Sequence, residues 1–153
     1  LHIFLAFKDT RADSVLLQEM NSGDYERCVK AITLAGMTDN SQVFTKLMEF
    51  VREKGFKKEK LEIRKESIRA LAAIANPAAL PYLQKVLKSI SLFSRQKLLT
   101  LKLEIVSSIE NYPSGDALPL LRKIAASGKG ELAIRAGKSL KNVKGKFIES
   151  ASK

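Results

Sequence analysis

The sequence has few of the residues on which small catalytic and metal sites usually depend. Its 153 residues include one histidine, His2, one cysteine, Cys28, and no tryptophan. A single cysteine excludes an intramolecular disulfide framework and any site that needs several thiolates. A lone histidine argues against a histidine-based metal or acid-base site. We expect Cys28 to be a buried, unreactive thiol, because thiols in apolar surroundings behave as small hydrophobic groups.

Long hydrophobic runs are also missing. No apolar run approaches the roughly 18 residues that a membrane span requires. The opening LHIFLAF is apolar, but it lacks the basic region and the small-residue cleavage site of a signal peptide. We therefore expect a cytoplasmic protein without a membrane span.

Glycine and proline are few and fall mostly at the ends of periodic apolar segments, as in a helical protein. The clearest such segment is 62–88, in which apolar or small residues recur at spacings of three and four. Asn76 and Pro77 interrupt it and suit the N-cap and first position of a second helix. The apolar positions are Ile63, Ser67, Ile68, Ala70, Leu71 and Ile74, then Leu80, Leu83, Val86 and Leu87. The segment predicts two helices joined by a tight corner, with Leu71 and Leu83 in the core.

This segment resembles the PBS-lyase HEAT-like repeats, which belong to the HEAT/armadillo-type α-solenoids. The resemblance begins at Ile63-Arg64 and continues through Ala70-Leu71, the Asn76-Pro77 corner and Ala79-Leu80-Pro81. It implies an all-α stack of antiparallel helix pairs, and members of the family are mostly interaction scaffolds. We expect Arg64, and Lys102 at the corresponding position, to pack or pair between neighbouring repeats.

Self-similarity supports a solenoid independently, because periods of roughly 20 to 50 residues are typical of repeat proteins. A shift of 38 residues carries Ile68 to Val106, Leu71 to Ile109, Leu83 to Leu121 and Lys85 to Lys123, and a shift of 39 in the other direction carries Leu71 to Ile32 and Val86 to Leu47. We predict about three to four repeats in a single domain spanning 1–153. The predicted units are a partial repeat at 1–22, repeats at 24–55, 58–89 and 95–127, a partial repeat at 131–143 and a basic, frayed tail at 144–153.

Several helix ends can be predicted from local signals. Asp13 and Ser94 are candidate N-caps, as are the residues around Asn40. Gly36 is placed to end a helix in the left-handed conformation.

Apolar residues outside the central segment also carry predictions. Tyr25 should be buried with Cys28, and Leu92 and Phe93 should anchor the connection before the third repeat. Because solenoids normally close their ends with polar caps, the apolar segment 1–7 favours a chain cut from a longer protein, and could also support self-association.

Positive charge is the main functional signal. The formal net charge is +11, and residues 71–153 hold 14 basic but 5 acidic residues. The candidate binding face lies on the second helices of two repeats and comprises Lys85, Lys88, Arg122 and Lys123. A cationic strip of this kind attracts phosphates, anionic surfaces or an acidic protein. The alternative interpretation, a solvated lysine face that binds nothing through charge, carries similar weight.

No catalytic motif accompanies this charge. The sequence has no phosphate-binding glycine loop and no nucleophile with a plausible histidine base. Glu66, Glu104 and Glu110 are more simply ion-paired or solvated helix residues. We predict a non-catalytic protein-binding scaffold without a cofactor. The alternative is nucleic-acid or anionic-surface binding through the basic face, although most of its charge is lysine rather than arginine or aromatic stacking groups.

Overall fold

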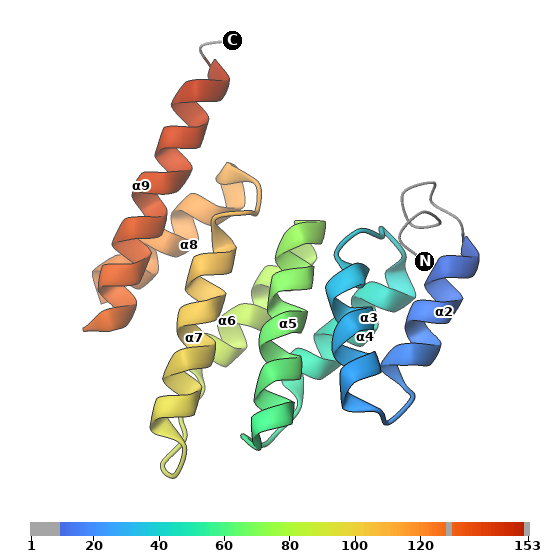
Figure 1. The fold of residues 1–153 in the computed structure, drawn as a ribbon. Coiled ribbons are helices and arrows are strands. Elements are labelled where there is room, and N and C mark those ends of the chain that lie inside the picture. Colours follow the sequence, from blue (N-terminus) through green and yellow to red (C-terminus); the bar gives the residue numbers. More distant parts are fainter. Residues whose placement is uncertain (1–9, 128–129, 152–153) are drawn as a thin grey trace.

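The computed structural model describes residues 10–127 and 130–151, and every regular element in these ranges is a helix (Figure 1). The elements are α2 (Thr10–Met20), α3 (Tyr25–Ala35), α4 (Ser41–Arg52), α5 (Lys58–Ile74), the short 3-10 turn η1 (Pro77–Ala79), α6 (Leu80–Lys88), α7 (Arg95–Ile109), α8 (Ser114–Ser127) and α9 (Glu131–Ala151). The all-α prediction is confirmed. No helix in these ranges is both long enough and apolar enough to cross a membrane. The segment 1–7 lies outside the described residues.

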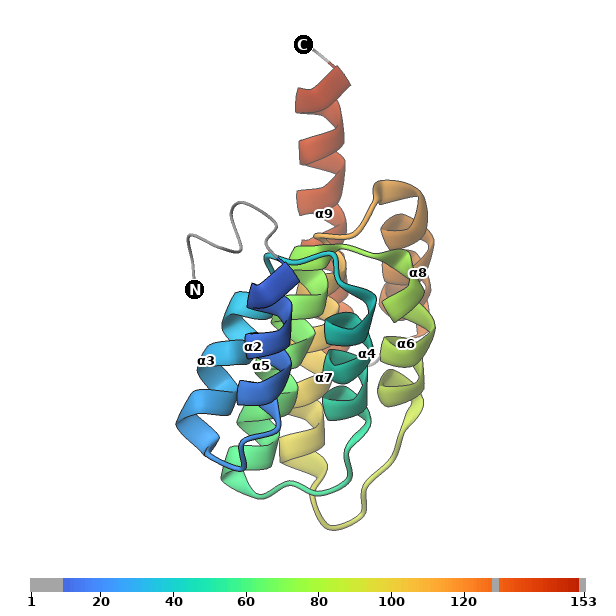
Figure 2. The ribbon, with the colours of Figure 1, turned by 90° about the vertical axis from the view of Figure 1, so that its right-hand side faces the viewer.

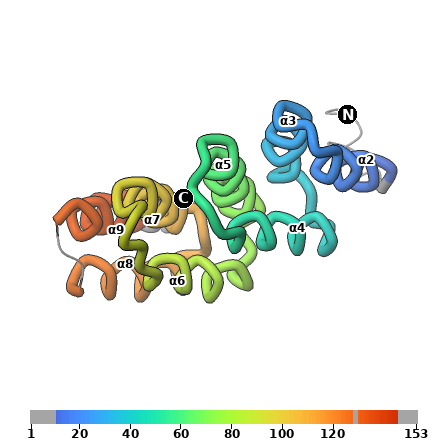
Figure 3. Tube along the Cα trace, turned by 90° about the horizontal axis from the view of Figure 1, so that it is seen from below, coloured from blue at the N-terminus to red at the C-terminus, as the bar shows by residue number. Residues whose placement is uncertain are grey.

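The helices form two rows, as expected for a solenoid. Seen from below, α3, α5, α7 and α9 follow one another in one row, and α4, α6 and α8 form the other (Figure 3). The view along the stack shows the same separation (Figure 2). α2 packs against α3 and α4 at one end, and α9 packs against α7 and α8 at the other. We call the row of α3, α5, α7 and α9 the first-helix row, and the row of α4, α6 and α8 the second-helix row.

The core repeats with the period found in the sequence. Ile68 and Val106, Leu71 and Ile109, and Leu83 and Leu121 are three pairs separated by 38 residues, and all six side chains are at most 1% exposed. Ile32 and Leu47 of the earlier, more diverged copy are also fully buried. Equivalent positions therefore occupy equivalent places in successive layers, and the predicted burial of Leu71 and Leu83 is confirmed.

Two predicted caps form as hydrogen bonds. The Asn40 side-chain oxygen accepts from the backbone N–H of Gln42 at 2.8 Å and of Val43 at 3.2 Å. That of Asn76 accepts from the N–H of Ala78 at 3.0 Å, and Pro77 opens the 3-10 turn that leads into α6. Ser94 precedes α7 as predicted, but its side chain makes no capping hydrogen bond.

Asp13 and Gly36 have roles other than those predicted. α2 begins at Thr10, so Asp13 lies inside its first turn. Its carboxylate accepts hydrogen bonds from Thr38 Oγ1 at 2.6 Å and Asn40 Nδ2 at 3.0 Å, which ties α2 to the corner between α3 and α4. Gly36 is right-handed, with φ of −64°. What it provides is space, because a Cβ there would lie 2.9 Å from Ala73 Cβ.

The structure also corrects three predictions about exposure and helix length. Tyr25, expected to be buried, is the first residue of α3 and is 36% exposed. Leu92 and Phe93, expected to anchor the connection before α7, are 71% and 99% exposed. The last helix does not end near Val143, because α9 continues to Ala151 through part of the predicted tail.

Candidate functional site

The four residues of the predicted basic face are all exposed on the second-helix row, but they do not all line one hollow. Lys85 and Lys88 lie on α6, and Arg122 and Lys123 lie on α8. Lys88 and Lys123 line the same groove between α6 and α8. Lys85 lines a different groove between α4 and α6, and Arg122 lines neither. The structure thus divides the predicted face between two neighbouring hollows.

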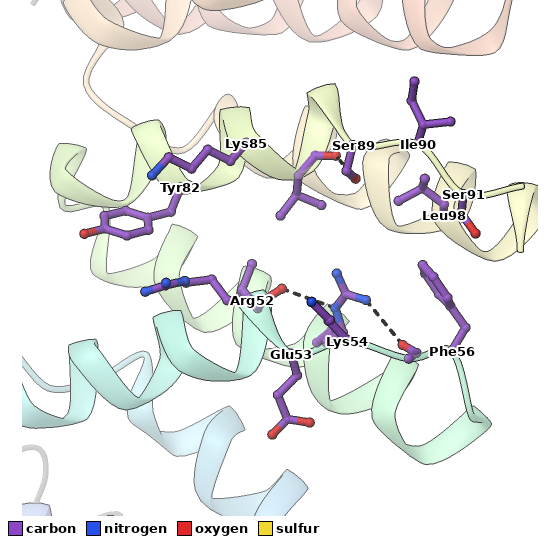
Figure 4. A pocket seen from close by; sticks show the side chains of 14 residues that line it. Arg52, Glu53, Lys54, Phe56, Tyr82, Lys85, Ser89, Ile90, Ser91 and Leu98 are labelled. Carbon is purple, nitrogen blue, oxygen red and sulfur yellow. Dashed lines mark hydrogen bonds between the residues drawn. The ribbon is translucent and has the colours of Figure 1, made fainter.

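The α4–α6 groove is the larger hollow, with a volume of about 460 Å³ (Figure 4). Its lining residues are Val51, Arg52, Glu53, Lys54, Gly55, Phe56, Arg64, Tyr82, Lys85, Val86, Ser89, Ile90, Ser91 and Leu98. At one end the Tyr82 ring lies between two cations, with Arg52 Cζ 5.8 Å and Lys85 Nζ 5.4 Å from its centroid. Sequence reasoning missed this arrangement because Arg52 and Tyr82 belong to different repeats.

Arg64 lines this groove, but its contacts stabilise the packing of α5 against the end of α4. It is 6% exposed, and its Nε donates to the Val51 carbonyl at 3.2 Å while Nη1 donates to the Gly55 carbonyl at 3.4 Å. Its guanidinium lies 5.3 Å from the centroid of the Phe56 ring. Burial lowers the pKa of Arg64 from its usual value. These contacts supply donors to two carbonyls at and beyond the end of α4, where a carbonyl has no N–H partner within the helix.

Lys102 repeats this contact one layer further along. Its Nζ donates to the Ser89 carbonyl at 2.7 Å, just after the end of α6, and burial lowers its pKa. In both pairs the donor follows the acceptor by 13 residues. The expectation that Arg64 and Lys102 pair between neighbouring repeats is confirmed.

The α6–α8 groove is smaller and more apolar. Its volume is about 250 Å³, and its lining residues are Gln84, Leu87, Lys88, Leu120, Lys123, Ile124, Ser127 and Leu132. Leu132 comes from α9, so the last helix contributes to the lining. None of these lining residues is acidic. The groove therefore offers an apolar floor with two exposed ammonium groups.

Several charged side chains of the first-helix row form contacts between neighbouring helices. On the first-helix row Arg69 donates to both carboxylate oxygens of Glu104, at 2.8 and 3.0 Å, and also pairs with Glu66. The contact with Glu104, together with that with Glu66, raises the pKa of Arg69. Glu110 accepts from Asn142 Nδ2 at 2.9 Å. Glu66 and Glu104 are thus ion-paired helix residues, as expected, whereas Glu110 follows the end of α7 and is hydrogen-bonded to an amide.

The second helices α6 and α8 contain a single acidic residue, Asp116. Within the described part of the chain, none of Lys85, Lys88, Arg122 and Lys123 forms an ion pair. These four side chains are therefore exposed cations without a carboxylate partner among the described residues.

The remaining reactive side chain is buried. Cys28 is 5% exposed, its Sγ donates to the Met20 carbonyl at 3.5 Å, and burial raises the pKa of its thiol. A buried thiol with a raised pKa is a poor nucleophile. Among the described residues no group of three or more His, Cys, Asp or Glu side chains is placed to hold a metal ion.

Comparison with known proteins bears on the central helix pair. Residues 63–89 match the PBS lyase HEAT-like repeat family. The match covers most of α5 and all of α6, the pair whose core positions recur at Val106, Ile109 and Leu121 in the next layer. No curated protein and no solved structure matches the chain significantly. The matched pair and its repetition identify the architecture as a HEAT-like α-solenoid.

Proposed function

We propose that this protein is a non-catalytic scaffold that binds an acidic segment of a protein partner along its second-helix row. The observation that carries the proposal is the pair of adjacent hollows, each combining apolar lining with exposed cations that lack carboxylate partners. Apolar side chains of a partner would fill the hollows, and carboxylates would pair with Lys85, Lys88 and Lys123. Repeat solenoids commonly bind extended partners on such a surface.

Capture of partner proteins from an extract of the source cells tests this proposal when a variant altered in a groove is compared with a variant altered elsewhere. Wild-type chain, the K88E/K123E variant and the K30E/K138E variant are each immobilised, and retained proteins are quantified by mass spectrometry. The second variant is the matched control, because Lys30 and Lys138 are exposed lysines of the first-helix row. We expect a partner that K88E/K123E loses and K30E/K138E retains. A partner retained equally by both variants, or turnover of a substrate by the purified chain, would contradict the proposal.

Nucleic acid is the second candidate for the same row. The cluster of Arg52, Tyr82 and Lys85 favours it, because single-stranded nucleic acids bind where cations flank an aromatic ring. If these cations contact phosphates, affinity for labelled single-stranded DNA or RNA should fall with salt, with a log–log slope of about −0.7 per contact. The K85E/K123E variant should weaken that binding without changing helicity. An absence of binding at low salt would leave the protein-binding proposal alone.

A further inference from the structure

The connection between α6 and α7 exposes three large apolar side chains. Phe93 is 99% exposed, Ile90 86% and Leu92 71%. This connection lies at the lower edge of the solenoid, the same edge as the connection between α4 and α5 (Figures 1 and 2). Single exposed apolar residues are ordinary, but a group of this kind marks an interaction surface.

The connection is held in place at its base. Lys102 Nζ donates to the Ser89 carbonyl at 2.7 Å, and the Ser89 hydroxyl donates to the Val86 carbonyl at 2.7 Å. Across the turn, the backbone N–H of Ser94 donates to Ser91 Oγ at 3.1 Å. Ser89, Ser91 and Ser94 are thus hydrogen-bonded within the chain, while the three apolar side chains are exposed to solvent.

Cations flank the apolar tip in the sequence. Lys88 precedes it, and Arg95 and Lys97 follow it, all three exposed. Lys97 Nζ also donates to the Phe56 carbonyl at 2.9 Å, which joins the connection between α4 and α5 to the same edge. That connection contributes exposed Lys54 and Lys57, together with Glu53, whose carboxylate pairs with Lys60 at 3.4 Å.

Negative charge is missing from this part of the chain. No aspartate or glutamate occurs in the sequence between Glu66 and Glu104. The tip and its flanks therefore combine apolar and positively charged groups without a nearby acidic residue of their own segment.

We propose that this edge docks on an anionic lipid membrane, with Ile90, Leu92 and Phe93 entering the interface and the surrounding cations contacting headgroup phosphates. Membrane interfaces bind surfaces that pair inserted apolar side chains with basic residues at headgroup depth. The long stems of lysine and arginine suit that depth, because they can lie along apolar material while their charges stay hydrated. A partner protein would need acidic groups in a matching arrangement around its own binding groove. An anionic bilayer supplies negative charge on all sides of the inserted tip. This surface adjoins the two grooves proposed to bind a partner, because Ile90 and Lys54 also line the α4–α6 groove and Lys88 lines the α6–α8 groove. Leu92 and Phe93 line neither groove.

Vesicle co-sedimentation tests the proposal with the full chain. The vesicles contain about one-third phosphatidylserine in phosphatidylcholine, or phosphatidylcholine alone, at low salt. We expect the wild-type chain to bind the anionic vesicles and to bind the neutral ones weakly. The L92S/F93S variant should bind the anionic vesicles at least about tenfold more weakly, because two apolar side chains no longer enter the interface.

The matched control is I134S, since Ile134 is 74% exposed in the first turn of α9, outside the α6–α7 connection. It should bind like the wild type, and R95E should weaken binding in a salt-dependent way. Circular dichroism of all variants checks that the helices are intact. Failure of the wild type to bind anionic vesicles would overturn the proposal, as would equal binding by L92S/F93S. Light scattering that shows an oligomer dissociated by L92S/F93S, without vesicle binding, would assign the tip to contact between copies instead. These outcomes are independent of the capture experiment, because Leu92 and Phe93 line neither groove.

Discussion

Single residues in this protein decide how closely neighbouring layers approach. Gly36 and Arg64 both act between a helix and the following repeat, one by having no side chain and the other by having a long one with several donors. Neither role depends on backbone flexibility or on surface charge. Substitution at these positions should therefore change stability through contacts between layers.

Gly36→Ala should destabilise the fold. The new Cβ would meet Ala73 Cβ at 2.9 Å, and because that atom is fixed to the backbone of α5, the two helices must move apart. We expect a loss of about 1–3 kcal/mol in the free energy of unfolding, measured by urea denaturation. The control is Gly137→Ala in α9, where nothing lies within 4 Å and the higher helix propensity of alanine should stabilise by about 0.5–1 kcal/mol. Equal effects of the two substitutions would show that helix packing at Gly36 is looser than described.

Arg64→Met should destabilise the protein by about 1–3 kcal/mol, because the Val51 and Gly55 carbonyls lose their donors. Arg64→Lys should cost less, since Lys102 shows that an ammonium group can serve one carbonyl at the equivalent position. Arg122→Met is the exposed control and should change stability by less than about 0.5 kcal/mol. Urea denaturation of the three variants measures the order. A lysine variant no more stable than the methionine variant would contradict the predicted rescue.

At the scale of elements, the corners determine where helices begin and how the rows connect. Asn40 and Asn76 occupy the same kind of position, before the second helix of successive repeats. Asn76 makes one capping hydrogen bond. Asn40 accepts two and also donates to Asp13 of α2. The earlier corner therefore joins three helices, whereas the later one joins two.

This difference predicts unequal costs for the two cap substitutions. Asn76→Ala should destabilise by about 0.5–2 kcal/mol, the usual effect of removing an N-cap. Asn40→Ala should cost more, because it also removes the contact to Asp13. Thermal or urea unfolding compares the two, and Asp13→Asn combined with Asn40→Ala measures the coupling. Equal costs, with no coupling between Asp13 and Asn40, would show that the link to α2 contributes nothing.

For the whole molecule, layered packing predicts local rather than uniform effects of mutation. α5 packs against α3, α4 and α7, whereas α2 packs against α3 and α4 at the end of the stack. In a solenoid each repeat contacts only its neighbours, so stability is close to a sum of repeat and interface contributions. A destabilising substitution in the central repeat should therefore lower the local stability of the adjacent layers more than that of distant ones.

Leu83→Ala tests this layered behaviour. Leu83 is fully buried on α6, and its truncation should cost about 2–5 kcal/mol. Hydrogen exchange followed by mass spectrometry should show faster exchange in α5, α6 and α7 than in the wild type, with a smaller change in α2. The exposed control Lys85→Ala should leave the pattern unchanged. A uniform rise in exchange along the chain would indicate one cooperative unit instead.

The sequence by itself determined the all-α class, the layers at a period of 38 residues and two of the helix caps. Periodic apolar residues specify which side of a helix is buried, and Asn-Pro chemistry specifies where a helix begins; both signals are local. It also placed Arg64 and Lys102 between repeats, because their positions recur. Only the tertiary structure decided which residues meet across layers. Lys88 lines the same groove as Lys123 while Lys85 lines another, Gly36 leaves space for Ala73, and Phe93 is exposed to solvent instead of buried in the core. Periodicity says that a face is covered but not by which neighbour, and in a connection without regular periodicity it gives no direction for a side chain at all.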